Sequence, residues 1–389
     1  PGMTMTAFAF NTVASIVSEP GAAARLGQIV AERFADVRRV LIVTDPGFLR
    51  TGLLEPARAS LEQQGLSVSI FSKVVADPPE HVIHAAVQAA REPQAELIIG
   101  FGGGSSMDVA KLVAVLAGSS QPLKDIYGIG NVKGQRLPLV QVPTTAGTGS
   151  EVTNIAIVTT GETTKMGVVA PQLYADLALL DAALTLGLPP LVTAATGIDA
   201  MVHAIEAYTS KFKKNPLSDN LAREALRLIS ANLMIAVEDG ANLEARQAML
   251  LGACLAGQAF SNAPVAAVHA LAYPIGGIFH VPHGLSNSLV LPHVLRFNAS
   301  HAAPLYAELA DIVVPGCSGT PEERTEALIA AMQQIAARTG IQTRLEEMGI
   351  AEADLDRLAD DAMLQTRLLG NNPRELTRAD ARAIYAAAL

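Results

Sequence analysis

The sequence predicts two domains, a doubly wound parallel α/β domain followed by an all-helical domain. The 389 residues exceed the usual length of one domain. Short apolar runs alternate with helical patterns as far as residue 188, whereas helical patterns follow one another after that point. The change falls at Pro189 and Pro190, so we expect one domain at 1–188 and a second at 189–389.

The first domain combines apolar strands with amphipathic helices. The expected strands are RRVLIVTD, LSVSIF, AELIIGFGGG and LPLVQVPTT, and the expected helices begin at LLEPAR, PEHVIH and SSMDVA. This alternation is typical of a parallel sheet with helices on both faces. Two β-rich runs then flank Gly161 and Glu162, which predicts a hairpin.

The second domain shows helical periodicity and no convincing series of strands. Helices are expected at about 191–212, 216–237, 242–261, 285–297, 321–339, 352–364 and 377–388.

Composition argues against several classes of protein. Hydrophobic residues make up 50% of the chain and charged residues 17%, a balance that supplies a core and argues against disorder. The net charge of -9 argues against nucleic acid as the main partner. No apolar run approaches the ~18 residues of a membrane span, and no signal pattern opens the chain. Cys254 and Cys317 give no disulfide framework, so we expect a cytoplasmic protein without a membrane partner.

A glycine cluster joins a strand to a helix in IIGFGGGSSMDVAK. Gly102, Gly103 and Gly104 let the backbone approach a ligand closely, and Ser105 or Ser106 can cap the helix. The N–H groups at a helix start bind anions. A tight turn also uses glycine, but three in succession exceed its need. The run therefore favours a nucleotide phosphate site of a variant kind, since GFGGGS departs from G-x-G-x-x-G.

Two further stretches add to the expected nucleotide site. VPTTAGTGSEVT presents Thr144, Thr145, Thr148 and Ser150, whose hydroxyls can bond phosphate or ribose, although such loops are common. Asp45 ends the strand VLIVTD, where a carboxylate can accept bonds from ribose hydroxyls and would repel a 2′-phosphate. The same residue can instead simply open the turn DPGF. If Asp45 contacts ribose, NAD is preferred over NADP.

A carboxylate and three imidazoles form the second group of interest. Asp199 and His203 lie four residues apart in GIDAMVHAIEAYTS, so one helix face carries both. Alone, this could be a satisfied polar pair. His269 and His283 flank YPIGGIFHVP, whose Pro and Gly residues are expected to break a helix, so the two rings can converge from different elements. The set suits Fe(II) or Zn(II).

Four motifs together resemble those of the iron-containing, group III alcohol dehydrogenases: GGGSSMDVAK, VPTTAGTGSEVT, GIDAMVHAIEAYTS and HALAYPIGGIFHVPHG. The resemblance extends over nearly the whole chain. It implies a dehydroquinate synthase-like architecture, with an NAD-binding domain, a helical metal- and substrate-binding domain, and the site in the cleft between them. It also implies a homodimer or larger homo-oligomer, and an alcohol or diol, or its aldehyde or ketone, as the small-molecule partner.

The resemblance also assigns roles to residues of this chain. The catalytic metal ligands would be Asp199, His203, His269 and His283. The cofactor contacts would be Asp45, Gly102, Gly103, Gly104, Ser105, Ser106, Asp108, Thr144, Thr145, Thr148, Ser150, Lys165 and Leu184. The substrate pocket would include Asn154, Phe260, Tyr273 and His280. Many relatives carry a histidine at the position of Tyr273, often with a substrate or proton-relay role, and a tyrosine does not titrate near neutral pH.

The implied reaction is reversible hydride transfer between an alcohol and NAD, with the metal as Lewis acid. A dehydroquinate-synthase-like lyase would instead use NAD transiently and give no net NADH. A maleylacetate-reductase-like enzyme would need no metal, which the intact Asp and His set argues against. A hydroxyacid–oxoacid transhydrogenase would retain NAD through its cycle. A non-catalytic sensor would have no use for a nucleotide site and a metal site in the same chain.

Overall fold

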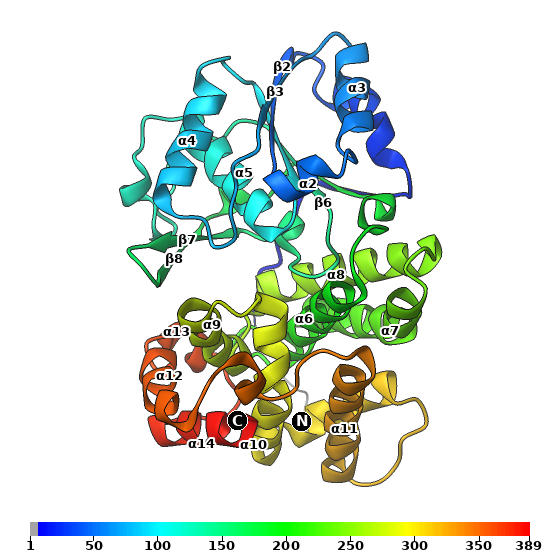
Figure 1. Ribbon diagram of the computed structural model, residues 1–389, viewed down its shortest axis with the longest axis vertical. Helices are drawn as coiled ribbons and strands as arrows, with labels where there is room; N and C mark the ends of the chain where they lie inside the picture. Colours follow the sequence, from blue (N-terminus) through cyan, green and yellow to red (C-terminus); the bar gives the residue numbers. More distant parts are fainter. Residues whose placement is uncertain (1–6) are drawn as a thin grey trace. The chain divides into compact units, whose positions relative to one another are not determined.

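The computed structural model describes residues 7–389, which form two compact units (Figure 1). One unit comprises Thr12–Gly187. The other comprises Leu188–Leu389 together with the described residues that precede Thr12. The chain passes between the units twice, after residue 11 and after residue 187, and the second passage lies where the sequence changes from alternating strands and helices to consecutive helices.

A six-stranded parallel sheet organises the α/β unit, in the order β1-β9-β6-β4-β2-β3. The four predicted strands are present, and the structure adds β1 and β9, which the sequence did not reveal because each has only four residues. The strands are β1 (Ser15–Ser18), β2 (Arg39–Val43), β3 (Ser67–Phe71), β4 (Leu97–Gly102), β6 (Leu139–Pro143) and β9 (Leu177–Leu180).

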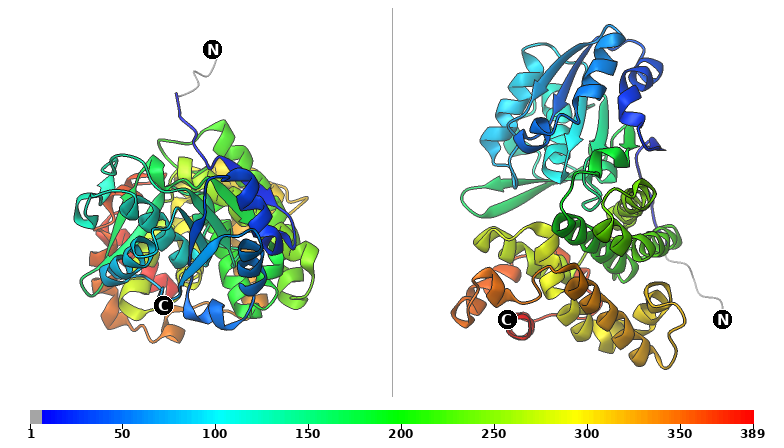
Figure 2. Two further views of the ribbon diagram at one scale, coloured as in Figure 1. Left: turned by 90° about the horizontal axis from the view of Figure 1, so that it is seen from above. Right: turned by 45° about the vertical axis from the view of Figure 1, so that its right-hand side comes forward.

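Helices cover both faces of this sheet, as the alternating pattern predicted (Figures 1 and 2). Ile99 and Phe101 of β4 belong to the core beneath α1 and α3, whereas Gly100 between them faces Ala110 of α5. Successive strand residues thus point to opposite helical layers. The helices are α1 (Leu26–Arg33), α2 (Pro46–Arg50), α3 (Glu55–Gln63), α4 (Glu80–Arg91) and α5 (Gly104–Ala117).

The predicted hairpin is confirmed. Strands β7 (Ile155–Thr160) and β8 (Thr164–Val169) pair in antiparallel fashion. They form a small sheet with β5 (Gly128–Ile129), in the order β5-β8-β7. Gly161 turns the chain with φ 66°, a left-handed value that glycine adopts at low cost. Figure 2 shows the hairpin extending away from the parallel sheet.

The regular secondary structure of the second unit is helical, with no strand among its described residues. Its first three long helices pack closely, because a Cβ at Gly197 of α6 would lie 2.6 Å from Leu233 Cδ1 of α7 and 2.8 Å from Met249 Cε of α8. The helices are α6 (Pro190–Tyr208), α7 (Pro216–Glu238), α8 (Leu243–Asn262), α9 (Ala267–Phe279), α10 (His283–Val313), α11 (Pro321–Thr339), α12 (Leu355–Ala362), α13 (Thr366–Gly370) and α14 (Arg378–Ala388).

One prediction for this unit is confirmed and one was wrong. The expected helix break does lie inside YPIGGIFHVP, because α9 continues through Pro274 but ends before His280, which has φ 57°, and α10 begins at His283. The helix expected at 285–297 runs instead for 31 residues. A proline removes one N–H bond, and burial of these helices compensates for that loss. In α10 the buried positions Asn298, Ala302 and Tyr306 recur every four residues, so packing continues past the predicted end.

No single helix among residues 7–389 is long and apolar enough to cross a membrane. Helices α8 and α9 meet the length and composition requirements only as a pair, across a bend of 107°.

Candidate functional site

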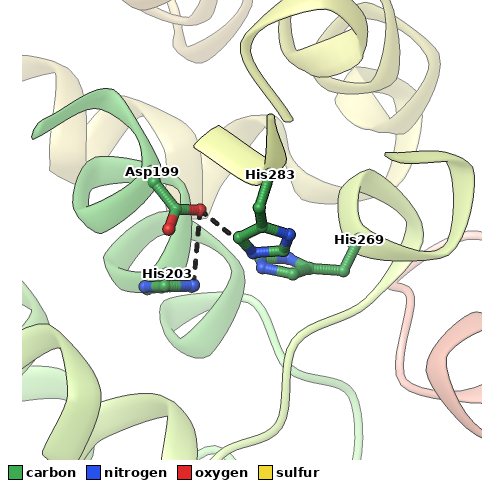
Figure 3. Close-up of side chains that lie close together, drawn as sticks. All are labelled: Asp199, His203, His269 and His283. Atoms are coloured by element: carbon green, nitrogen blue, oxygen red, sulfur yellow. Dashed lines mark ion pairs between the residues drawn. The ribbon is translucent and has the colours of Figure 1, made fainter. Parts of the chain in front are cut away.

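Asp199, His203, His269 and His283 converge in the helical unit (Figure 3). Each offers one ligand atom, and these atoms lie within 4.8 Å of one another. Asp199 Oδ1 is 3.5 Å from both His203 Nε2 and His283 Nε2. Ligand atoms about 2.1 Å from a shared ion, at tetrahedral angles, lie roughly 3.4 Å apart. The cluster therefore has the donors and the spacing that a divalent first-row metal requires.

Three helices bring these side chains together. The first two ligands are one turn apart on α6, His269 lies on α9, and His283 is the first residue of α10. Gly284 allows the start of α10 to approach α6, because a Cβ there would lie 2.5 Å from the carbonyl oxygen of Ala195. A side chain at this position would push His283 away from Asp199.

Burial separates the cluster into an inner side and an accessible side. Asp199, His203 and His269 are 2–3% exposed, whereas the His283 side chain is 41% exposed. Burial by itself would raise the pKa of Asp199, but the three imidazoles and the Asn287 amide outweigh it, so the pKa is lowered. Asp199 is thus an anion that favours a cation here, and a small molecule can reach the cluster beside His283.

Two buried residues that the sequence analysis missed contact the cluster. Glu206 bonds to the Nδ1 of His269 at 2.6 Å. The Asn287 amide donates to Asp199 Oδ1 at 2.5 Å. Both follow a ligand by one helical turn, since Glu206 comes three residues after His203 and Asn287 four residues after His283. That spacing was the available signal.

Two of the expected pocket residues border the cluster. The ring centroid of Phe260 lies 4.4 Å from that of His203. The Tyr273 ring is 6.2 Å from the His283 ring and 6.3 Å from the His269 ring. His280 is exposed in the turn after α9, and Asn154 belongs to the α/β unit, where it precedes β7. The structure therefore groups Phe260 and Tyr273 with the ligands, and the roles expected for His280 and Asn154 stay predictions.

The α/β unit contains a cavity of about 460 Å³ at the carboxyl ends of β2 and β4. Asp45 and the run Gly103–Ser106 line it, together with Arg50, which the sequence analysis did not single out. Strand β2 pairs with β3 on one side and β4 on the other, so the chain reverses its direction of strand addition here. Ligands of open α/β sheets bind at such a switch point.

The glycine cluster permits close packing at two positions and leaves open space at a third. A Cβ at Gly102 would lie 2.8 Å from Ser106 Cβ, and one at Gly104 would lie 2.9 Å from Thr148 Cγ2, so folding itself favours glycine at both positions. A Cβ at Gly103 would meet only the Thr145 hydroxyl, at 3.9 Å. Gly103 thus leaves open space beside the first turn of α5, where backbone N–H groups can bind an anion.

Asp45 caps a helix and also lines the cavity. Its Oδ1 accepts a hydrogen bond from Phe48 N at 2.8 Å and so caps α2. Its Oδ2 lies 3.5 Å from the position of a Cβ on Gly102, and the residue lines the cavity. One carboxylate oxygen therefore supports the fold while the residue also borders the space expected for ribose.

Several other predicted cofactor residues are engaged in the fold. The buried Lys111 ammonium donates to Ser150 Oγ, Thr153 Oγ1 and Ile155 O, each at 2.9 Å. Ser150 Oγ in turn donates to Asp108 Oδ1 at 2.7 Å. These contacts fix the hydroxyl-rich loop to α5. Asp108 and Ser150 therefore act here as internal partners of that loop.

The remaining predicted residues lie in different parts of the α/β unit. Thr144 is buried at the end of β6, where its N–H bonds to Gly102 O at 2.9 Å. Lys165 forms an ion pair with Asp77 at 2.9 Å. Leu184 is buried in the core beneath α1 and α3. Neither Lys165 nor Leu184 lines the cavity.

Comparison with known proteins places both units in one group. Residues 14–182 match the family described as iron-containing alcohol dehydrogenase, and residues 193–389 match the C-terminal part of the Fe-containing alcohol dehydrogenase family. The chain is 43% identical over 368 residues to a protein named long-chain-alcohol dehydrogenase 1 from Geobacillus thermodenitrificans, covering 93% of each chain.

Solved structures agree with this match over the full length. A crystal structure of 1,3-propanediol oxidoreductase superposes with a TM-score of 0.95 and 33% identity, covering 99% of this chain and 100% of that one. A sulfoacetaldehyde reductase from Bifidobacterium kashiwanohense, in complex with NAD+, superposes with a TM-score of 0.88 and 28% identity over 99% of each chain.

Proposed function

The chain belongs to the iron-containing alcohol dehydrogenase family, and we propose that it catalyses reversible hydride transfer between NAD and a primary alcohol or diol. The observation that carries this proposal is the convergence of one carboxylate and three imidazoles from three helices. An isolated polar pair on α6 would not need His269 and His283 beside it, so the cluster favours a metal centre.

We infer that Asp199, His203, His269 and His283 hold Fe(II), with Zn(II) as the alternative that the same donors accept. Such an ion supplies Lewis acidity, which makes deprotonation of an alcohol accessible near neutral pH. Asp199 compensates part of the ion's charge, and the Asn287 amide fixes the orientation of that carboxylate. Phe260 covers His203 and restricts water on that side.

The cavity of the α/β unit is our proposed NAD site. Gly103 and the first N–H groups of α5 would bind the pyrophosphate, since a helix start favours negative charge. Asp45 would accept hydrogen bonds from the ribose hydroxyls, which favours NAD over NADP. The contacts proposed for the other cofactor residues, Lys165 and Leu184 included, stay predictions.

The aromatic rings beside the metal cluster suggest the class of substrate. Phe260 and Tyr273 present aromatic rings beside the histidines, and such surfaces accept an aliphatic chain better than a charged group. Tyr273 can donate a hydrogen bond to a substrate oxygen, but it does not titrate near neutral pH. We therefore propose unbranched primary alcohols and terminal diols, a choice supported by the names of the long-chain-alcohol and propanediol relatives.

NADH formation from a panel of straight-chain alcohols and diols tests this function, measured before chelation, after chelation, and after addition of Fe(II) or Zn(II). We expect NADH to form, to stop on chelation, and to resume with metal. Metal dependence without net NADH would point to a lyase or a transhydrogenase. Turnover that survives complete chelation would contradict the metal centre.

Two further properties belong to the same proposal. We infer a homodimer or larger oligomer, which light scattering would test. A reducing, cytoplasmic location is consistent with Cys254 and Cys317, which form no disulfide within residues 7–389. Localisation of a fluorescently tagged chain would check it.

A further inference from the structure

Glu206 is a carboxylate in an unusually buried place. It lies on α6, is only 4% exposed, and contacts α9 with both of its oxygens. One oxygen bonds to His269 Nδ1 at 2.6 Å, and the other accepts from Val268 N at 3.0 Å. Carboxylates this deep are rare unless they are paired. Both contacts lead to the one helix that carries His269.

The first contact determines which nitrogen of the His269 ring carries the hydrogen. A carboxylate can only accept, so the hydrogen of the His269 ring sits on Nδ1. His269 Nε2 then keeps its lone pair, and it faces the cluster, 3.3 Å from the Asn287 amide nitrogen. Metal-binding histidines commonly donate their second ring nitrogen to a carboxylate, which fixes both the tautomer and the ring plane.

The second contact determines where α9 begins. Val268 is the second residue of this helix, and the N–H groups of a first turn have no partner within the helix. Glu206 binds one of them and places negative charge at the positive end of the helix dipole. The same carboxylate thus anchors the helix that carries His269 and orients its ring.

We propose that Glu206 is a positioning residue of the metal centre, which holds His269 with Nε2 directed at the ion and so strengthens metal binding. This inference rests on the proposed metal-dependent function. Loss of such an outer carboxylate typically weakens metal binding by roughly 10–100-fold. A purely structural Glu206 would instead anchor α9 without changing the affinity for metal.

Glu206→Gln and Glu206→Leu test this role, with Tyr385→Phe as the matched control. Glutamine offers one acceptor to two donors, so either His269 or Val268 loses its partner. Leucine removes both contacts. Tyr385→Phe also removes a buried hydrogen bond to α9, from the Tyr385 hydroxyl to Leu271 O at 2.6 Å, but it leaves the imidazole untouched. All three variants therefore loosen α9, and only the Glu206 variants can release His269.

The probe is Co(II), titrated into the full-length apoprotein against a competing chelator. We expect its dissociation constant to rise about 10-fold in Glu206→Gln and up to about 100-fold in Glu206→Leu. In Tyr385→Phe we expect a lower apoprotein Tm but a dissociation constant within about twofold of the wild type. The visible absorption of bound Co(II) should change in the Glu206 variants alone, because it reports ligand geometry.

The outcomes separate this inference from the proposed function. Wild-type affinity in both Glu206 variants would overturn the positioning role alone. An equal loss of affinity in Tyr385→Phe would also overturn it, because general loosening of α9 would then explain the result. If the wild type itself binds no metal, or if His283→Ala binds it equally well, the metal function fails first.

Discussion

The cavity proposed to bind NAD and the cluster proposed to bind metal are built in opposite ways. The cavity is formed by backbone and small residues at the ends of two adjacent strands, and its main features lie within short motifs. The cluster is formed by side chains from three helices that are far apart in the sequence. Substitutions that add side-chain atoms should therefore impair binding in the cavity, whereas substitutions that remove side-chain atoms should impair binding in the cluster.

The difference also extends to the supporting contacts. In the α/β unit one buried cation, Lys111, holds the loop next to the glycine cluster. In the helical unit Glu206 and Asn287 hold individual ligands. A backbone site needs its loops fixed in place, whereas a side-chain site needs each ring and carboxylate oriented.

Removal of one metal ligand should have the largest effect. His269→Ala should lower turnover by roughly 10³-fold or more, because Lewis-acid stabilisation is worth several kcal/mol and about 1.4 kcal/mol is tenfold in rate. NADH binding, measured by fluorescence titration, should stay within about twofold of the wild type. Loss of NADH binding together with turnover would contradict the prediction that the two sites act independently.

Removal of the loop's internal cation should come next. Lys111→Met leaves Ser150, Thr153 and Ile155 without their buried donor, and should destabilise the α/β unit by about 3 kcal/mol. Thermal unfolding measures this loss, and the metal content should stay unchanged. Wild-type stability in the variant would show that the loop is held in some other way.

The same loop should give the protein a pH-dependent stability. Burial raises the pKa of Glu151 to about 7, against the opposing effects of a backbone hydrogen bond and of Lys111. The folded state therefore binds this proton more tightly than the unfolded state, and stability falls as pH rises from about 4.5 to about 7. The free energy of unfolding of Glu151→Gln, taken relative to that of the wild type, should therefore increase by roughly 1–3 kcal/mol from pH 5 to pH 8.

Thermal unfolding of the two proteins between pH 5 and pH 8 checks this sign. The wild-type Tm should fall across the interval, and that of Glu151→Gln should fall less. Parallel curves would mean that Glu151 contributes nothing to the pH dependence.

A single added methyl group should give the smallest and most selective effect. Gly103→Ala meets no close protein atom, so the apoprotein Tm should stay unchanged, but the methyl group would occupy the space proposed for the pyrophosphate. We expect NAD affinity to fall by about tenfold. Gly102→Ala is the contrasting control, since its Cβ approaches Ser106 and should lower the Tm itself. Unchanged NAD affinity in Gly103→Ala would mean that the glycine serves only the turn.

The two sites also differ in how far the sequence revealed them. The glycine run and Asp45 could be found because each follows an apolar strand, and adjacent parallel strands end at one edge of a sheet. Asp199 and His203 could be paired by their helical spacing, and a proline- and glycine-rich segment suggested that His269 and His283 converge. The helix does break within that segment, at residues 280–282, although α9 first continues through Pro274.

Other features depended on contacts that no local pattern contains. Glu206 acquires its role only when α9 lies against α6, and Gly284 only when α10 starts beside Ala195. Asp108 and Ser150 bond to each other inside the fold, a contact that their motifs did not predict.

Metal content per chain of anaerobically purified protein tests the central claim most directly, measured in parallel for the wild type and for Asp199→Ala. We predict about one equivalent of iron or zinc in the wild type and less than about a tenth of that in the variant, because the variant lacks the only anionic ligand of the cluster. Equal metal content in the two proteins, or none in the wild type, would contradict a metal centre at Asp199, His203, His269 and His283.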